Sequence, residues 1–122
     1  MLAEEREEED EGNEASDPDL KEGVRWFRMA AERGYAPSMF SLASSYQDGR
    51  GVEQDGTQAV GWFKKAAAQG SSNAMYDLGY MYGAGDGVKQ DDVEAVRWYR
   101  EAAERGYRTA QYNLGWMHEQ GR

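Results

Sequence analysis

The residues in this sequence that could do chemistry are a glycine-rich stretch, several aspartates, one histidine and a set of aromatic side chains. Residues 83–87 read Gly-Ala-Gly-Asp-Gly. A phosphate-binding loop of this kind follows a strand, and in the P-loop a Lys-Ser or Lys-Thr pair comes next. Here the preceding residues have the pattern of a helix and no such pair follows. We therefore interpret these glycines as turn residues.

Metal binding and catalysis have little support. The chain has no cysteine and one histidine, His118, so a zinc site lacks ligands. Asp86, Asp91 and Asp92 lack the ladder of oxygen ligands of an EF-hand loop. A carboxylate-based hydrolase needs paired acids in a pocket, whereas the acids here are predicted to cap helices or face solvent. The sequence predicts no enzyme, no cofactor and no metal.

The aromatic residues belong to an internal repeat. Trp26, Trp62 and Trp98 are 36 residues apart, and the same shift superimposes further residues without any insertion. These further columns are Gly34, Gly70 and Gly106; Leu42, Leu78 and Leu114; and Asp19, Asp55 and Asp91. A fixed period of this length is typical of a stacked helical array. The tryptophans, and the column of Tyr46, Tyr82 and His118, are accordingly predicted to pack between repeats.

Each repeat contains two predicted helices. The first begins at residues 19, 55 and 91, where an aspartate precedes Glu or Gln by three residues, as in a capping box. It ends at Gly34, Gly70 or Gly106, which suit a left-handed residue after a helix. The second helix spans about Ser72–Ala84 in the middle unit. A loop with two glycines and a valine, either Val52 or Val88, leads to the next unit.

These motifs resemble the Sel1-like repeat family, a relative of the tetratricopeptide repeats. The resemblance covers residues 19–122. Its best copy matches at Ala74, Leu78, Gly79, Tyr82, Gly85, Gly87, Val88, Asp91, Ala95, Trp98, Tyr99, Ala102, Ala103 and Gly106. It implies an all-α fold: an α-solenoid of antiparallel helix pairs, with six helices in a right-handed superhelix and units at 19–54, 55–90 and 91–122. It also implies a scaffold for protein–protein contacts with no catalytic motif. By the family's phasing the chain holds a half repeat at each end, so we expect a fragment of a longer array.

The net charge of −9 lies in the first residues of the chain. Residues 1–19 hold ten acids and one arginine, so the rest is neutral. We expect residues 1–18 to be an acidic disordered leader, either a solubilising linker or a lure for a basic partner. Nucleic-acid binding is not expected, because no basic stripe is present. No apolar run is long enough to span a membrane and no secretory signal is present, which favours a cytoplasmic protein.

The predicted binding surface lies on the second helix of each unit, which lines the concave face in solenoids of this type. Positions two before and two after Leu78 should face the groove. They give one row of Phe40, Tyr76 and Tyr112, and another of Ser44, Tyr80 and Trp116. A protein or peptide segment is the expected partner, with the five aromatic residues Phe40, Tyr76, Tyr80, Tyr112 and Trp116 as contacts. Otherwise, neighbouring helices cover these rows.

The alternative function is structural. The chain would then be an oligomerisation or spacer module of a longer protein, with possible end-to-end self-association through the terminal helices at residues 19–33 and 109–120. The basic column of Arg28, Lys64 and Arg100 is expected on a solvated face, with Glu32 and Glu104 as weak partners of the two arginines.

Overall fold

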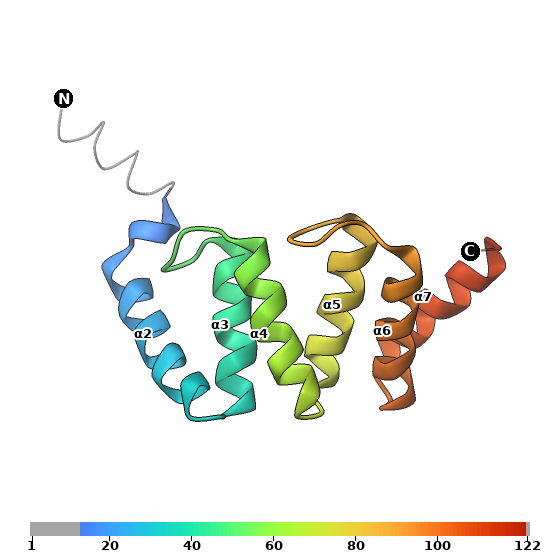
Figure 1. The fold of residues 1–122 in the computed structure, drawn as a ribbon, viewed down its shortest axis with the longest axis horizontal. Coiled ribbons are helices and arrows are strands. Elements are labelled where there is room, and N and C mark those ends of the chain that lie inside the picture. Colours follow the sequence, from blue (N-terminus) through green and yellow to red (C-terminus); the bar gives the residue numbers. More distant parts are fainter. Residues whose placement is uncertain (1–12, 122) are drawn as a thin grey trace.

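The computed structural model describes residues 13–121 and shows a row of α-helices that stand side by side (Figure 1). A short 3₁₀ helix, η1 (Glu14–Ser16), precedes six α-helices, as the repeat predicts. These are α2 (Pro18–Glu32), α3 (Ala36–Asp48), α4 (Gly56–Ala68), α5 (Ser72–Ala84), α6 (Asp92–Glu104) and α7 (Arg108–Glu119). The chain runs along the row in sequence order, so α2 and α7 lie at opposite ends (Figure 1). Residues 1–12, which hold most of the predicted acidic leader, lie outside the described part.

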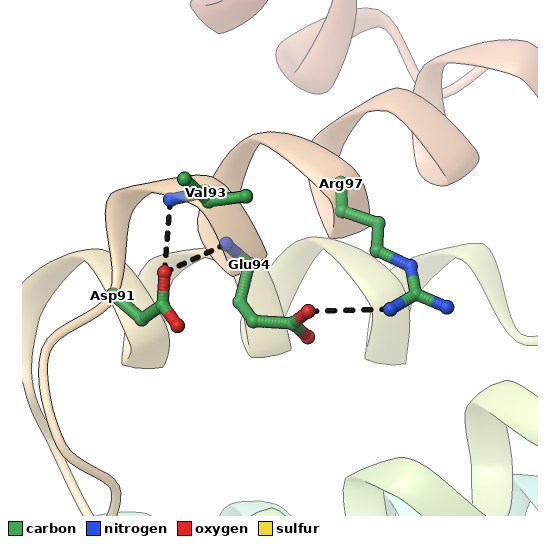
Figure 2. Close-up of polar contacts among 4 residues, drawn as sticks. All are labelled: Asp91, Val93, Glu94 and Arg97. Atoms are coloured by element: carbon green, nitrogen blue, oxygen red, sulfur yellow. Dashed lines mark hydrogen bonds and ion pairs between the residues drawn. The ribbon is translucent and has the colours of Figure 1, made fainter.

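Two of the three predicted aspartate caps are confirmed. The Asp55 side chain accepts a hydrogen bond from the amide of Gln58, 3.2 Å away. Asp91 accepts from the amides of Val93 and Glu94 at 3.0 and 3.1 Å (Figure 2). Each bond satisfies an amide that has no partner within its own helix. The side chain of Glu94 forms an ion pair with Arg97 and does not complete the reciprocal half of a capping box (Figure 2).

The third predicted cap, at Asp19, is wrong. Helix α2 begins two residues earlier than the other units predict, and Asp17 caps it by accepting from the amides of Asp19 and Leu20. The reason is local. Pro18 follows Asp17, and proline suits the first helical position because its missing amide hydrogen needs no partner there.

Glycines in left-handed conformations end the helices and bring the loops close to the neighbouring unit. Gly34, Gly70 and Gly106 have φ angles of 92°, 94° and 87°, as predicted. In the loop before α6, a Cβ on Gly87 would overlap the backbone carbonyl of Gly56. This close approach lets the loop pack on the first turn of α4.

A continuous apolar core runs between the helices. Its largest fully buried side chains are Phe63, Leu42, Met75, Leu78 and Met81. The loop residues Val52 and Val88 pack against this core. Gly79 lets α5 approach α6 closely, because a Cβ at this position would lie 2.7 Å from the Tyr99 ring. Within residues 13–121, no helix is long and apolar enough to cross a lipid bilayer.

The predicted packing of the tryptophan column fails at one end of the array. Trp62 and Trp98 are half-buried against the core, but Trp26 is 61% exposed. The prediction for His118 is also wrong, because it is exposed on α7. Both residues lie in the first or last α-helix of residues 13–121, and within this range each of those helices has a neighbouring α-helix on one side only (Figure 1).

The polar side of the first helices differs from expectation in one respect. Arg28 does not pair with Glu32. Its guanidinium donates a hydrogen bond to the Tyr46 hydroxyl at 2.6 Å and lies 5.6 Å from the centre of that ring. Lys64 sits at the same distance over Tyr82, one repeat later. These contacts place a cation over a tyrosine ring, and each one ties two neighbouring helices together.

Candidate protein-interaction surface

The five predicted contact residues come from α3, α5 and α7, which we call the A helices. They differ in exposure. Tyr80, Tyr112 and Trp116 are 53%, 73% and 46% exposed. Phe40 and Tyr76 are half-buried and pack against the core. We define the A-helix surface as the exposed side of the A helices that carries Ser44, Tyr80 and Trp116.

The half-buried residues Phe40 and Tyr76 pack against aromatic rings of neighbouring elements. The Phe40 ring meets Phe63 of α4 edge-on, with 5.5 Å between ring centres. Tyr76 contacts two rings, those of Tyr99 in α6 at 5.3 Å and Tyr107 before α7 at 5.0 Å. Contacts of this geometry stabilise a core beyond the area that they bury. These two residues therefore have a packing role in addition to any contact with a partner.

The hydroxyl of Tyr76 is also engaged. It accepts a hydrogen bond from the side-chain amide of Asn113 at 3.3 Å, so Tyr76 links α5 to α7. Tyr112 occupies the same position one repeat later on α7, the last helix of the described residues, and it is the most exposed of the five. Its exposure thus reflects its place at the end of the row.

Tyr80 has a different environment, because helices lie on both sides of α5 along the row (Figure 1). Among residues 55–90, it is the one large hydrophobic side chain that is exposed. Solvent-accessible hollows adjoin the other members of its row. Ser44 lines a cavity of about 400 Å³ with Phe40 and Asp48, and Trp116 lines one of about 300 Å³ with Tyr99 and Asn113.

Asp77 is the notable residue that sequence reasoning missed. Burial raises the pKa of its carboxyl to about 6, and the negative charge of Asp48 on α3 adds to the rise. Within residues 13–121, no group donates a hydrogen bond to this carboxylate and no cation pairs with it. A partly desolvated charge without a partner is unfavourable. It would be relieved by a cation supplied from outside.

The neighbours of Asp77 are tyrosines. Burial first, then the nearby groups Tyr76, Asp77 and Tyr80, raise the pKa of the Tyr99 hydroxyl to about 12, against the opposing effect of a hydrogen bond with Asn113. Burial and then the charge of Asp77 also raise the pKa of Tyr107. At neutral pH the site therefore contains neutral hydroxyls around one acid.

A sequence signal for Asp77 did exist. The position just before the buried leucine holds Ser41, Asp77 and Asn113 in the three copies, so it is polar next to a core residue. That pattern marks a position at the edge of the core, and Asp77 is the one acid among the three. How far Asp77 is buried depends on α3 and α6, and repeat spacing does not show that. Within residues 13–121, the structure brings no three potential metal ligands together.

Comparison with known proteins agrees with this architecture. No curated protein sequence matches the chain. Among solved structures, a Sel1 repeat protein from Oxalobacter formigenes is 37% identical, with a TM-score of 0.78 over 83% of this chain and 42% of that one. A protective antigen present in uropathogenic Escherichia coli strains, which displays an SLR fold, is 39% identical. Its TM-score is 0.82 over 97% of this chain and 28% of that one.

A third structure, the cysteine rich protein B of Helicobacter pylori, is 25% identical with a TM-score of 0.71, over 75% of this chain and 68% of that one. The chain thus spans less than half the length of the first two structures. A family model described as the Sel1 repeat matches residues 8–35, 36–71, 72–107 and 108–122. Proteins with this repeat generally serve as scaffolds for protein interactions and are typically not catalytic. The chain therefore belongs to the Sel1 repeat family.

Proposed function

We propose that this chain is a non-catalytic scaffold that binds a protein or peptide segment on its A-helix surface. Tyr80 and Trp116 are the main contacts, flanked by Phe40, Tyr76 and Tyr112. The observation that supports this most directly is the exposure of Tyr80 in the middle unit. An exposed aromatic ring inside the array is not an effect of a missing neighbour, and tyrosine is a frequent anchor of protein interfaces.

The charge of the surface favours a basic partner. The negative charge of Asp48 lies close enough to the Asp77 carboxyl to raise its pKa. Tyr80 lies three residues after Asp77 on the same helix, α5. A lysine or arginine side chain could pair with the Asp77 carboxylate while its aliphatic part packs on the Tyr80 ring. We therefore propose a segment with an exposed Lys or Arg beside an apolar residue.

A peptide selection tests the function and reveals which kind of segment binds. Random peptides displayed on phage are selected on the 122-residue chain, and the affinities of enriched peptides are measured by fluorescence anisotropy. The double variant Tyr80→Ala, Trp116→Ala should lose at least about tenfold in affinity, since two interface anchors are removed. The control variant Trp26→Ala, Tyr35→Ala removes the same side-chain types from exposed positions outside this surface and should bind as wild type does.

Two results would contradict the proposal. One is that no peptide is enriched. The other is that the enriched peptides bind the wild type and the Tyr80, Trp116 variant equally well. The basic-partner element has its own test, because Asp77→Asn removes the charge and keeps the shape. It should weaken peptides that carry Lys or Arg and leave their norleucine or citrulline analogues unaffected.

A further inference from the structure

Apart from Tyr80, the exposed large hydrophobic side chains of the described residues lie in the N-terminal helix–turn or in the C-terminal helix pair. Near the N-terminus, α2 and the turn after it expose Trp26, Phe27, Met29 and Tyr35. Near the C-terminus, α6 and α7 expose Val93, Tyr112 and Trp116. Helices α2 and α7 are at opposite ends of the row (Figure 1). Within residues 13–121, each of these ends is therefore an apolar face that no helix covers.

The contact between α5 and α6 shows how the equivalent faces pack against each other inside the array. Tyr76 and Gly79 are on α5. The Tyr76 ring packs against the rings of Tyr99 and Tyr107, and Gly79 leaves the space that the Tyr99 ring occupies. The earlier pair, α3 and α4, repeats part of this arrangement through Phe40 and Phe63.

The two ends carry the separated halves of this same contact. One repeat after Tyr76 and Gly79 stand Tyr112 and Gly115 on α7. Tyr112 is 73% exposed, and nothing lies within 4 Å of a Cβ built on Gly115. Two repeats before Tyr99 and Tyr107 stand Phe27 and Tyr35, which are 36% and 60% exposed. All four positions retain the residue type that the internal contact uses: an aromatic ring or a glycine.

We propose that a second copy of this chain docks head to tail, with α2 of the second copy packed on α7 of the first as α6 packs on α5. Tyr112 would then meet Phe27 and Tyr35 of the second copy, and the Phe27 ring would fill the space beside Gly115. Two different surfaces meet in this interface, so each added copy leaves one free end of each kind. Assembly of this type grows with concentration and does not stop at a dimer.

The sequence ahead of α2 does not continue the apolar pattern of the repeat. One repeat before Leu42 and Tyr46 stand Arg6 and Asp10, so the apolar positions of an A helix are charged there. The junction would differ from the internal one at one point, because Ala15 stands in the column of Gly51 and Gly87. The contact should therefore be confined to the helices and be weaker than an internal one.

This inference does not rest on the proposed binding function, but it would cover Tyr112, one of the flanking residues of the proposed binding surface. It assigns Tyr112 to the contact between copies, because the equivalent Tyr76 is covered by the next unit. Trp116 shares its column with Tyr80, which remains exposed with neighbours on both sides. The A-helix surface would thus continue from one copy to the next.

Sedimentation velocity of the 122-residue chain from micromolar to millimolar concentration tests the assembly. The average mass should rise above 13.8 kDa with no plateau at twice that value. Gly115→Glu places a charged side chain in the proposed contact and should keep the chain monomeric. Gly61→Glu is the matched control, because Gly61 is also an exposed helical glycine with nothing within 4 Å of a built Cβ. It should assemble as wild type does, and circular dichroism should show that both variants are helical.

Mixing two blocked chains tests the polarity of the contact. Gly115→Glu blocks the α7 end, and Tyr35→Glu blocks the α2 end. Each variant alone should be monomeric, whereas an equimolar mixture should form a heterodimer from the one intact end on each. The proposal is overturned by a wild-type mass that stays at 13.8 kDa, by assembly of Gly115→Glu equal to that of Gly61→Glu, or by a mixture without heterodimer.

Discussion

The contact between Gly79 and Tyr99 gives the sharpest stability prediction. A methyl group on Gly79 would lie 2.7, 2.8 and 3.0 Å from three ring carbons of Tyr99. Ordinary contact begins at 3.4 Å, so the ring would have to move by about 0.7 Å. Tyr99 is buried and its ring also contacts that of Tyr76, with 5.3 Å between ring centres, so such a movement would disturb this packing. Gly79→Ala should therefore strain the interface between α5 and α6.

The size of the effect follows from two opposing terms. Overpacking of a core typically costs about 1–3 kcal/mol. Alanine in place of glycine within a helix returns about 1 kcal/mol. The net loss for Gly79→Ala is then roughly 0–2 kcal/mol. Gly115→Ala makes the same exchange in the same column with no atom within 4 Å, so only the favourable term applies.

The comparison of the two variants isolates the packing term, because the helix-propensity term cancels. Urea denaturation followed by far-ultraviolet circular dichroism, on dilute protein, should find Gly79→Ala less stable than Gly115→Ala by about 1–3 kcal/mol. Equal stability of the two variants would refute the reasoning. It would mean that α5 and α6 can separate without cost.

Other predictions concern single side chains. Asp17→Ala should lower the free energy of unfolding by about 1 kcal/mol, whereas Asp19→Ala should change it little; equal losses in urea denaturation would contradict the cap at Asp17. Phe63→Ala should cost about 3–5 kcal/mol and show as a loss of helical circular dichroism at lower urea. The pKa of the Asp77 carboxyl is about 6 in the folded chain, against its ordinary value of 3.8. The protonated form therefore adds to the free energy of unfolding. This contribution is complete below pH 3.8 and is lost as the pH rises through 6. Asp77→Asn should remove that pH dependence and, after allowance for solvent screening, raise stability at neutral pH by about 1 kcal/mol; identical pH profiles for the two chains would refute the assigned environment.

The sequence predicted the internal architecture well. The reason is that the residues that contact one another inside the array recur at the same spacing in successive repeats. The expected helix at Ser72–Ala84 has those bounds in the structure, and Gly70 before it has the expected left-handed backbone. The prediction failed where a local signal competed with the repeat. Pro18 after Asp17 moved the start of α2, although Asp19 occupies the capping column.

The surface was harder to predict, for a different reason. Periodicity places a side chain on a face of a helix, but its exposure depends on what lies next to that helix. Trp26 and Trp62 share a column and differ in burial, because only Trp62 has a neighbour on both sides. Asp77 was missed for the same reason, because its burial depends on neighbouring helices. Its polarity is visible in the sequence, whereas its partial burial comes from packing between elements.

The graded exposure of the tryptophans gives the protein a built-in optical reporter. Trp26 and Trp116 are 61% and 46% exposed and lie in the two terminal helices, whereas Trp62 and Trp98 are shielded in between. A water-soluble quencher should therefore reduce the emission of the terminal pair first. Loss of that accessible fraction on mixing copies or adding a peptide would reveal which end or surface has been covered, with no attached label.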